Sequence, residues 1–249
     1  MENKPLVSIL LLTLDRFHIT NYCFNKAIEK AGTKDFELLV LDNNSSDYRT
    51  STAKYINSDL IPSDRIFTVF DNQKNNGIAG GYNQLIKKAK GEHICFLPND
   101  IVLSENWLVD LIRYNTDVYK SGLTSIHCEG DRGVYMPLLN ERDEFTSVWK
   151  NKEGITSGVS LINMNALGAI GKFDETLGVY GREREQFARR LSLLGYYNYY
   201  IPNQSSIHLG KEVNEINDYT KMKEKALQIG NARYNTALEE MKKTNNYCL

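Results

Sequence analysis

Four short apolar runs divide the first hundred residues of the chain: Val7–Leu12, Phe36–Leu41, Ile66–Phe70 and Ile94–Leu97. Their starts are roughly 30 residues apart, which is the length of a strand–helix–strand unit. Between them, Ile19–Ala31 and Tyr82–Ala89 place apolar residues every three or four positions, as an amphipathic helix does. The strand runs are continuously apolar rather than alternating. The pattern therefore predicts an α/β domain with a mostly parallel, doubly wound sheet that is covered on both faces.

After Asp100 the pattern is less regular. We expect, in order, a helix capped by Ser104, strands at Leu123–His127 and Ser157–Ile162, a helix at Glu183–Leu194, and a strand at Tyr196–Ile201 that ends at Pro202. The polar stretch Cys128–Gly154 is predicted to be a long loop. Asp218–Lys243 is predicted to be a polar helix with few apolar positions, which either packs on the core or extends toward a partner.

Composition excludes some classes of protein. The chain has 249 residues, with 30 Lys and Arg against 31 Asp and Glu, so its net charge is −1. This balance argues against a nucleic-acid-binding domain, which carries a basic excess, and against an acidic disordered chain. The run Pro5–Leu14 is too short to span a bilayer. The four cysteines form no Cys-x-x-Cys pair, so we expect reduced thiols in a cytoplasmic protein.

Polar clusters follow three of the four predicted strands: Thr13-Leu14-Asp15-Arg16, Asp42-Asn43-Asn44-Ser45-Ser46-Asp47 and Pro98-Asn99-Asp100. Each cluster alone is typical of a turn with a helix cap. Ligands of open α/β sheets bind at the carboxyl ends of the strands, and these clusters meet there. Asp42 and Asp100 are the carboxylates that come directly after buried strands, so the three clusters together predict a binding site.

A glycine-rich turn runs into a helix at Asn75–Ile86. Gly77, Gly80 and Gly81 allow the backbone to approach a ligand, and the helix N-terminus favours an anionic group. The alternative is that these glycines only let the helix pack closely on the sheet. The segment lacks the Lys-Ser/Thr ending of a phosphate-binding P-loop and the spacing of a dinucleotide fingerprint.

The segments VSILLLTLDR, ELLVLDNNSSD and NNGIAGGYNQLIKKAKGEHICFLPNDIVLSENWL resemble the nucleotide-binding half of a family 2 glycosyltransferase with the GT-A fold. GVSLINMNALGAIGKFDETLGVYGREREQFARRLSLLGYYNYYIP resembles the acceptor-side half. The resemblance covers roughly Val7 to Leu209 and is nearest to the branch that builds bacterial surface polysaccharides. It implies one GT-A domain over residues 1–210, with a Rossmann-like nucleotide-sugar-binding half (1–102), an acceptor half (103–210) and a helical tail (211–249).

The resemblance also implies roles for particular residues. Those implied to bind the nucleotide sugar are Thr13, Asp15, Arg16, Asp42, Asn43, Asn76, Gly77, Gly81, Asn83, Asn99 and Asp100. Asp100 matches the last acid of the family's Asp-x-Asp motif, which holds Mn²⁺ or Mg²⁺ on the donor diphosphate. Pro98 replaces the first acid of that motif, so the expected divalent cation would be held by Asp100, with Asn99 as a candidate helper. Weak or absent metal dependence is the alternative. His208 is a candidate second ligand, the alternative being an ordinary hydrogen-bonded histidine.

The resemblance places the catalytic base at the start of a helix, where inverting members carry a Glu-Asp pair. Here Glu183-Arg184 occupies these positions, and a guanidinium stays protonated. Glu183 or Glu185 is the candidate replacement, because a carboxylate can take the proton of an acceptor hydroxyl. The alternative is that both glutamates only complement the positive end of the helix. Arg182 and Arg184 are candidates for binding an anionic acceptor or the diphosphate.

The resulting hypothesis is an enzyme that moves a sugar from a UDP- or dTDP-sugar to a hydroxyl of a glycan or lipid-linked acceptor, with inversion at the anomeric carbon. The competing hypothesis is a GT-A protein with impaired catalysis that binds nucleotides or sugars, or assists an enzyme. A sugar nucleotidyltransferase is disfavoured because Thr13–Arg16 contains no glycine. We expect no nucleic-acid partner, at most peripheral membrane association, and possible oligomers through the C-terminal helix.

Overall fold

The computed structural model describes residues 4–46, 67–117, 119–129, 158–209 and 218–249, so most of the predicted loop Cys128–Gly154 lies outside the described residues. The strands are β1 (Val7–Thr13), β2 (Phe36–Asp42), β3 (Phe67–Asp71), β4 (His93–Leu97), β5 (Ile101–Leu103), β6 (Ser121–Glu129), β7 (Ser160–Asn163) and β8 (Tyr197–His208). The helices are α1 (Phe17–Glu29), α2 (Gly77–Ile86), α3 (Trp107–Asp117), α4 (Met164–Ile170), the 3-10 turn η4 (Glu175–Leu177), α5 (Glu183–Leu193) and α6 (Asp218–Thr244).

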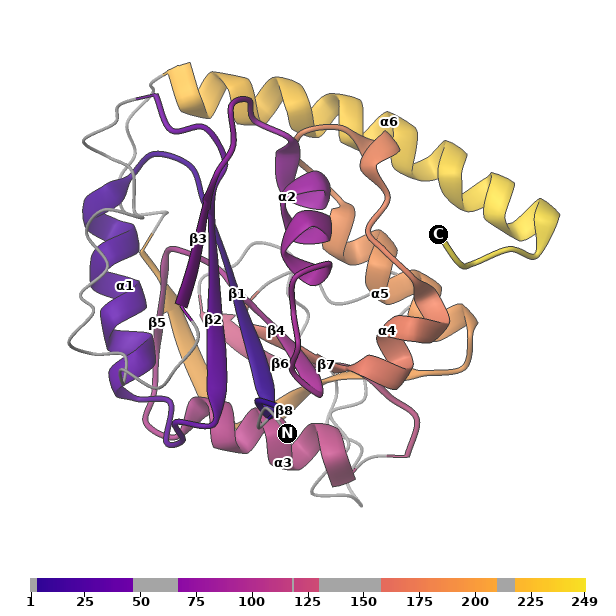
Figure 1. Ribbon diagram of the computed structural model, residues 1–249. Helices are drawn as coiled ribbons and strands as arrows, with labels where there is room; N and C mark the ends of the chain where they lie inside the picture. The colour runs from indigo at the N-terminus through magenta and orange to yellow at the C-terminus, as the bar shows by residue number, and fades with distance from the viewer. Residues whose placement is uncertain (1–3, 47–66, 118, 130–157, 210–217) are drawn as a thin grey trace.

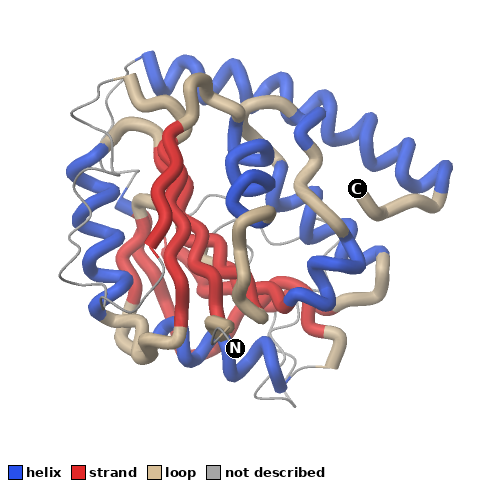
Figure 2. The backbone as a smooth tube through the Cα atoms, in the orientation of Figure 1, coloured by secondary structure: helices blue, strands red, loops and turns tan. Residues whose placement is uncertain are grey.

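All eight strands form one sheet in the order β3-β2-β1-β4-β7-β6-β8-β5, seen in red in Figure 2. The pairs β3·β2, β2·β1 and β1·β4 are parallel, as the spacing of the apolar runs predicts. Every residue of β2 and β4 is buried, because helices cover both faces. The carboxyl ends of these strands therefore lie together at one edge of the sheet (Figure 1).

The core has two layers, one on each face of the sheet. On one face α1 and α3 pack against the sheet, and the Trp107 indole N–H donates to the Ala27 carbonyl at 2.7 Å. On the other face α2, α4 and α5 pack, with Phe173 stacked on Phe187 at 4.3 Å between ring centroids. This arrangement confirms the predicted doubly wound architecture.

The second half of the sheet is mixed, and it corrects two predictions. The helix expected to be capped by Ser104 begins at Trp107, and the Ser104 hydroxyl donates instead to the Ser205 carbonyl at 3.1 Å. The strand expected to end at Pro202 continues to His208. A register shift opposite β6 accommodates Pro202, since a proline in a strand is tolerated at a bulge. The last residues of β8 then pair antiparallel with β5, which places His208 opposite Ile101.

Three short elements, β5, α4 and η4, are not predicted by the sequence pattern. Strand β5 is only three residues long, and its run of apolar residues is too short to give a pattern. Helix α4 has seven residues and is capped by Asn163, whose side chain accepts a hydrogen bond from the Ala166 N–H at 2.9 Å. Such short elements depend on tertiary packing rather than on local periodicity.

The sequence allows two placements of the C-terminal helix α6, packed on the core or extended toward a partner. In the structure it packs on the core. It runs across the carboxyl ends of the parallel strands (Figure 1, yellow). Two residues of this helix, Tyr234 and Met241, are buried. Over the part of the chain that the structure describes, no helix combines the length and apolar character needed to cross a membrane.

Candidate functional site

The loops that follow β1 and β2 are fastened to each other. The Asp15 carboxylate accepts hydrogen bonds from the Ser46 N–H at 2.7 Å and the Ser46 hydroxyl at 2.9 Å. The Asp15 N–H in turn donates to the Ser45 hydroxyl at 2.9 Å. Asp15 and Arg16 both have left-handed backbone conformations, with φ of 51° and 58°. Consecutive strained residues of this kind persist where the surroundings fix them, commonly at functional sites.

Asp42 ends β2 and is only 3% exposed. Its Oδ1 accepts from the Ser45 N–H and hydroxyl, both at 2.8 Å. Its Oδ2 has no hydrogen-bond partner among the described residues, and neither has the buried Thr13 Oγ1 beside it at the end of β1. A buried carboxylate oxygen without a donor is costly, and it is suited to accept an N–H from a ligand.

Asn43 fixes the turn that starts α2. Its amide nitrogen donates to Asn75 Oδ1 at 2.8 Å and to the Gly77 carbonyl at 3.1 Å. Its amide oxygen accepts from the Asn76 N–H at 3.1 Å. Gly77 has φ +73°, and a Cβ there would lie 2.7 Å from the Val179 Cα. Only glycine fits this position, which joins the glycine-rich turn to the segment before α5.

Asp100 lies between two basic side chains and is 8% exposed. Arg16 Nη1 and His208 Nε2 are each 3.5 Å from Asp100 Oδ2. Arg16 comes from the end of β1, and His208 from the end of β8, which the pairing with β5 carries past Asp100. The structure thus gathers the predicted metal pair, Asp100 and His208, with Arg16 at one point.

A divalent ion at this point would have two protein ligands. Mn²⁺ and Mg²⁺ are commonly held by one or two protein side chains, with phosphate oxygens and water completing the shell. Asp100 and His208 fit this requirement only together with a phosphate-bearing ligand. Within the described ranges, no group of three or more His, Cys, Asp or Glu side chains gathers to hold a metal by itself. The replacement of the first acid by Pro98 accounts for this small ligand set.

Three residues assigned to nucleotide-sugar binding are occupied within the protein. The Asn83 amide bonds both the carbonyl and the N–H of Phe173, at 3.0 and 2.9 Å, and also Glu175 Oε1 at 2.8 Å. Gly81 lies against Leu12 of β1, so close packing accounts for it, which was the alternative considered for this turn. Asn99 donates to the Thr20 hydroxyl at 3.0 Å. These contacts give the three residues roles in positioning the site.

Helix α5 begins with the candidate bases, and the structure separates them. Glu183 is 4% exposed, and its Oε1 has no hydrogen-bond partner among the residues described. Burial raises the pKa of this carboxyl, although backbone N–H groups of Glu183 and Gly181 oppose the shift. Glu185 instead forms an ion pair with Arg182. A buried carboxyl with a raised pKa and an unused oxygen is suited to take up a proton.

Arg184 stands where inverting relatives are expected to carry the base. Its guanidinium donates to the Gly158 carbonyl at 2.5 Å and to the Tyr82 hydroxyl at 3.0 Å. It therefore ties the start of α5 to α2 and to the segment before β7. The other arginine considered for anion binding, Arg182, donates to Asn231 of α6 at 2.8 Å. Both guanidiniums hold elements around the site together.

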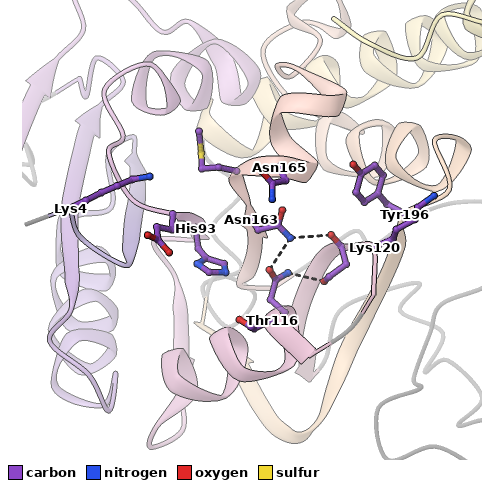
Figure 3. Close-up of a pocket in the computed structure, with 11 residues that line it drawn as sticks. Lys4, His93, Thr116, Lys120, Asn163, Asn165 and Tyr196 are labelled. Carbon is purple, nitrogen blue, oxygen red and sulfur yellow. Dashed lines mark hydrogen bonds between the residues drawn. The ribbon is translucent and has the colours of Figure 1, made fainter.

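A separate cavity of about 520 Å³ opens at the other end of the parallel strands (Figure 3). It is lined by the start of β4 at His93, by the start of α4, and by Thr116 and Lys120. Asn115 and Asn163 in its wall bond each other and their neighbours. None of the predicted site residues lines it, and it lies at the amino end of β4, away from the edge where open α/β sheets bind ligands.

Comparison with known proteins identifies the family of the chain. A family model described as Glycosyl transferase family 2 matches residues 8–170. An uncharacterized protein of Haemophilus influenzae is 31% identical over 119 residues, which cover 47% of this chain and 60% of that protein. This chain therefore spans less than two thirds of that relative's length.

Solved glycosyltransferase structures have a similar fold. The mannosyltransferase PcManGT of Pyrobaculum calidifontis, in complex with GDP-Man and Mn²⁺, superimposes with a TM-score of 0.63 at 17% identity, over 84% of this chain and 58% of that one. TarS 1-349 of S. aureus, in complex with UDP-GlcNAc, gives 0.57 at 20% identity, over 82% and 56%. These likenesses confirm the predicted GT-A fold.

Proposed function

The chain belongs to glycosyl transferase family 2, and from this premise we propose that it transfers a sugar from a UDP- or dTDP-sugar to an acceptor hydroxyl with inversion. The observation that carries the proposal is the group of Arg16, His208 and Asp100 at the carboxyl edge, with both basic groups 3.5 Å from one carboxylate oxygen. Basic side chains around a single acid suit a donor diphosphate, which is anionic and brings further metal ligands.

On the donor side, Asp42 supports recognition of the base. Its Oδ2, which no other described residue bonds, is an acceptor for the imide N–H that uracil and thymine share. Neighbouring structures in the comparison contain GDP-Man or UDP-GlcNAc, so nucleoside diphosphate sugars are the relevant ligand class. A bound divalent ion at Asp100 and His208 would offset charge on the departing diphosphate. Arg16, at the same carboxylate, contributes positive charge from the protein itself.

On the acceptor side, Glu183 is the proposed general base. Its carboxylate accepts the proton of the acceptor hydroxyl as that oxygen forms a bond to the anomeric carbon. The bond from this carbon to the diphosphate oxygen breaks, and the electron pair leaves with the diphosphate. Burial, which raises the pKa of Glu183, improves its match to a proton taken at neutral pH. Glu185 is assigned a structural role through its ion pair with Arg182.

A second candidate is a protein that binds the donor without turning it over. The position of Arg184 favours it, since a guanidinium bonded to Gly158 and Tyr82 stands in place of the expected acid. The two candidates differ in turnover and share nucleotide binding. Release of UDP from UDP-sugars, or of dTDP from dTDP-sugars, separates them.

Titration calorimetry with UDP and dTDP, in EDTA and in Mn²⁺, is the first test, followed by nucleotide release from a panel of UDP- and dTDP-sugars. We expect UDP or dTDP to bind in both media, more tightly with Mn²⁺. Slow donor hydrolysis is expected even without the natural acceptor, because water can replace the hydroxyl. If no nucleoside diphosphate binds, the proposal is wrong. If binding occurs without turnover in the presence of candidate acceptors, the second candidate is correct.

A further inference from the structure

The C-terminal helix α6 is seated on the segment that leads into α5. Arg233 Nη1 donates to the Thr176 carbonyl at 3.0 Å, and Asn231 accepts from Arg182 at 2.8 Å. Near the middle of the helix the contact is closest, because Gly230 faces the Gly181 carbonyl and a Cβ there would lie 2.9 Å from that oxygen. These contacts hold α6 on the segment from η4 to the start of α5. Figure 1 shows the helix at the end of the molecule where the parallel strands have their carboxyl ends.

One lysine of this helix turns inward. Lys223 is half-buried, while Lys221 and Lys225 on either side are exposed. Its Nζ lies 4.7 Å from the centre of the Tyr180 ring, which is a cation–π distance. It also interacts electrostatically with both Asp100 and Arg16. Lys223 thus connects the segment before α5 with the group of side chains at the end of β4.

The charge around Asp100 is then unusual for a metal-centred site. Arg16 and His208 each lie 3.5 Å from one oxygen of the Asp100 carboxylate, and Lys223 is near enough to Asp100 and Arg16 to interact with their charges. Pro98 takes the position of a second acid. Arg16 is permanently charged. Burial lowers the pKa of Lys223, but the charge of Asp100 favours its ammonium form, so this lysine adds positive charge beside that of Arg16. Such a place suits a group with more than one negative charge, and the diphosphate of a nucleotide meets this requirement.

We propose that Lys223 binds the donor diphosphate together with Arg16, so that α6 forms one wall of the donor site. The inference rests on the proposed function, because it names a ligand group of the same site. It gives the C-terminal helix a direct role in substrate binding. The sequence pattern predicted only that this helix packs on the core or extends toward a partner. The alternative is that Lys223 only supports Tyr180, and this alternative makes a different prediction for ligands that lack phosphate.

The test compares Lys223→Gln, Lys223→Arg and a matched control, Lys225→Gln, on the same helix. Calorimetry in EDTA measures Kd for three probes: UDP, inorganic pyrophosphate and uridine. Thermal unfolding confirms that each variant is folded. For Lys223→Gln, we expect Kd to rise about tenfold for UDP and pyrophosphate, the loss of one charge-assisted hydrogen bond, with no change for uridine. Lys223→Arg keeps the charge and is expected to retain most of the affinity, and Lys225→Gln to match the wild type.

The outcomes separate this inference from the proposed function. If Lys223→Gln binds UDP and pyrophosphate as the wild type does, the inference is overturned and the proposed function stands. Equal weakening of uridine and UDP would also overturn it, because a supporting role for Lys223 predicts that result. If the wild type binds pyrophosphate in a Lys223-dependent way but binds no nucleotide, the anion site is confirmed and the proposed function fails.

Discussion

Asp100 on the proposed donor side and Glu183 on the proposed acceptor side are both buried acids, and their surroundings differ. Asp100 on the donor side has basic groups of Arg16 and His208 at 3.5 Å from one oxygen. Glu183 on the acceptor side keeps one oxygen without a partner among the described residues, and burial raises its pKa. A carboxylate among cations is suited to organise an anion with its counter-ion. A buried carboxylate with an unused oxygen is suited to exchange a proton.

The surroundings of Glu183 and Glu185, both at the start of α5, also differ. Glu185 is two residues from Glu183 and equally buried, but it is ion-paired with Arg182. Arg182 in turn is bonded to Asn231 of α6 and lies 5.4 Å from the Tyr234 ring. Glu185 therefore belongs to the attachment of α6, whereas Glu183 is the residue that we propose as the general base. Neither assignment follows from the sequence pattern Glu-Arg-Glu.

The largest expected effect is that of Glu183→Gln on turnover. Removing a general base lowers the rate by about 10²–10⁴-fold, so nucleotide release from donor sugars should fall by that factor while the Kd for UDP stays unchanged. Steady-state release and calorimetry on one preparation give both values. Glu185→Gln is the matched control, which should keep most of its turnover and lose thermal stability through the ion pair with Arg182. Undiminished turnover in Glu183→Gln would remove the assignment of the base.

The next effect tests whether the two sides depend on each other through Gly77. An alanine there places a Cβ 2.7 Å from the Val179 Cα, in a backbone with φ +73°. Helix α2 and the segment before α5 must therefore both shift. We expect a loss of about 1–3 kcal/mol in the free energy of unfolding, together with weaker UDP binding. Urea unfolding and calorimetry measure the two. Gly168→Ala in α4 is the control and should not lose stability, because an added Cβ there would meet no neighbouring group within 4 Å. Gly77→Ala with wild-type stability would show that the contact is not tight in solution.

The donor half of the fold was predictable because its strands are simple in sequence. Each of β1, β2 and β4 is a continuous apolar run followed by polar residues, since each is buried on both faces and ends at the site. The same argument predicted that Asp42 and Asp100 lie at the carboxyl edge, where the structure places them, and their role in binding stays a prediction. The second half was less predictable because its strands are mixed in direction. β8 continues through Pro202 only because β6 and β5 supply partners on either side of the bulge.

The sequence is also limited in assigning site residues, because the contacts of their side chains depend on the tertiary structure. Resemblance assigns Asn83 and Gly81 to the nucleotide, but the bonds of Asn83 to Phe173 and the contact of Gly81 with Leu12 depend on tertiary structure. Lys223 gave no signal, because it lies among exposed lysines on a helix with few apolar positions, and its partners are far away in the sequence. The division of the chain into residues 1–210 and a tail stays a prediction, although α6 is attached to the core.

A smaller effect distinguishes the two roles proposed for Asp100. Asp100→Asn removes the carboxylate that pairs with Arg16 and would hold a divalent ion. Without metal, the remaining basic groups should bind UDP as tightly as before or more tightly, since a negative charge near the diphosphate is gone. The increase in UDP affinity that Mn²⁺ brings to the wild type should be lost, about tenfold or roughly 1.4 kcal/mol. Calorimetry in EDTA and in Mn²⁺ measures both. A persisting Mn²⁺ effect would place the metal elsewhere.

The smallest expected effect is on the pH dependence of stability, and it tests the acceptor side alone. The pKa of Glu183 is higher in the folded protein than the ordinary value of 4.5, so folding favours its protonated form. The stability from this group is fully present below pH 4.5 and is lost as the pH rises through the folded pKa. Glu183→Gln stays neutral, so it should become more stable relative to the wild type as the pH rises through this window, and then level off. A pKa raised by one corresponds to about 1.4 kcal/mol. Urea unfolding from acid to mildly alkaline pH measures the difference in free energy of unfolding between Glu183→Gln and the wild type. Glu240→Gln, at an exposed position, is the control. A difference that stays constant across this pH range would mean that Glu183 is not buried in solution.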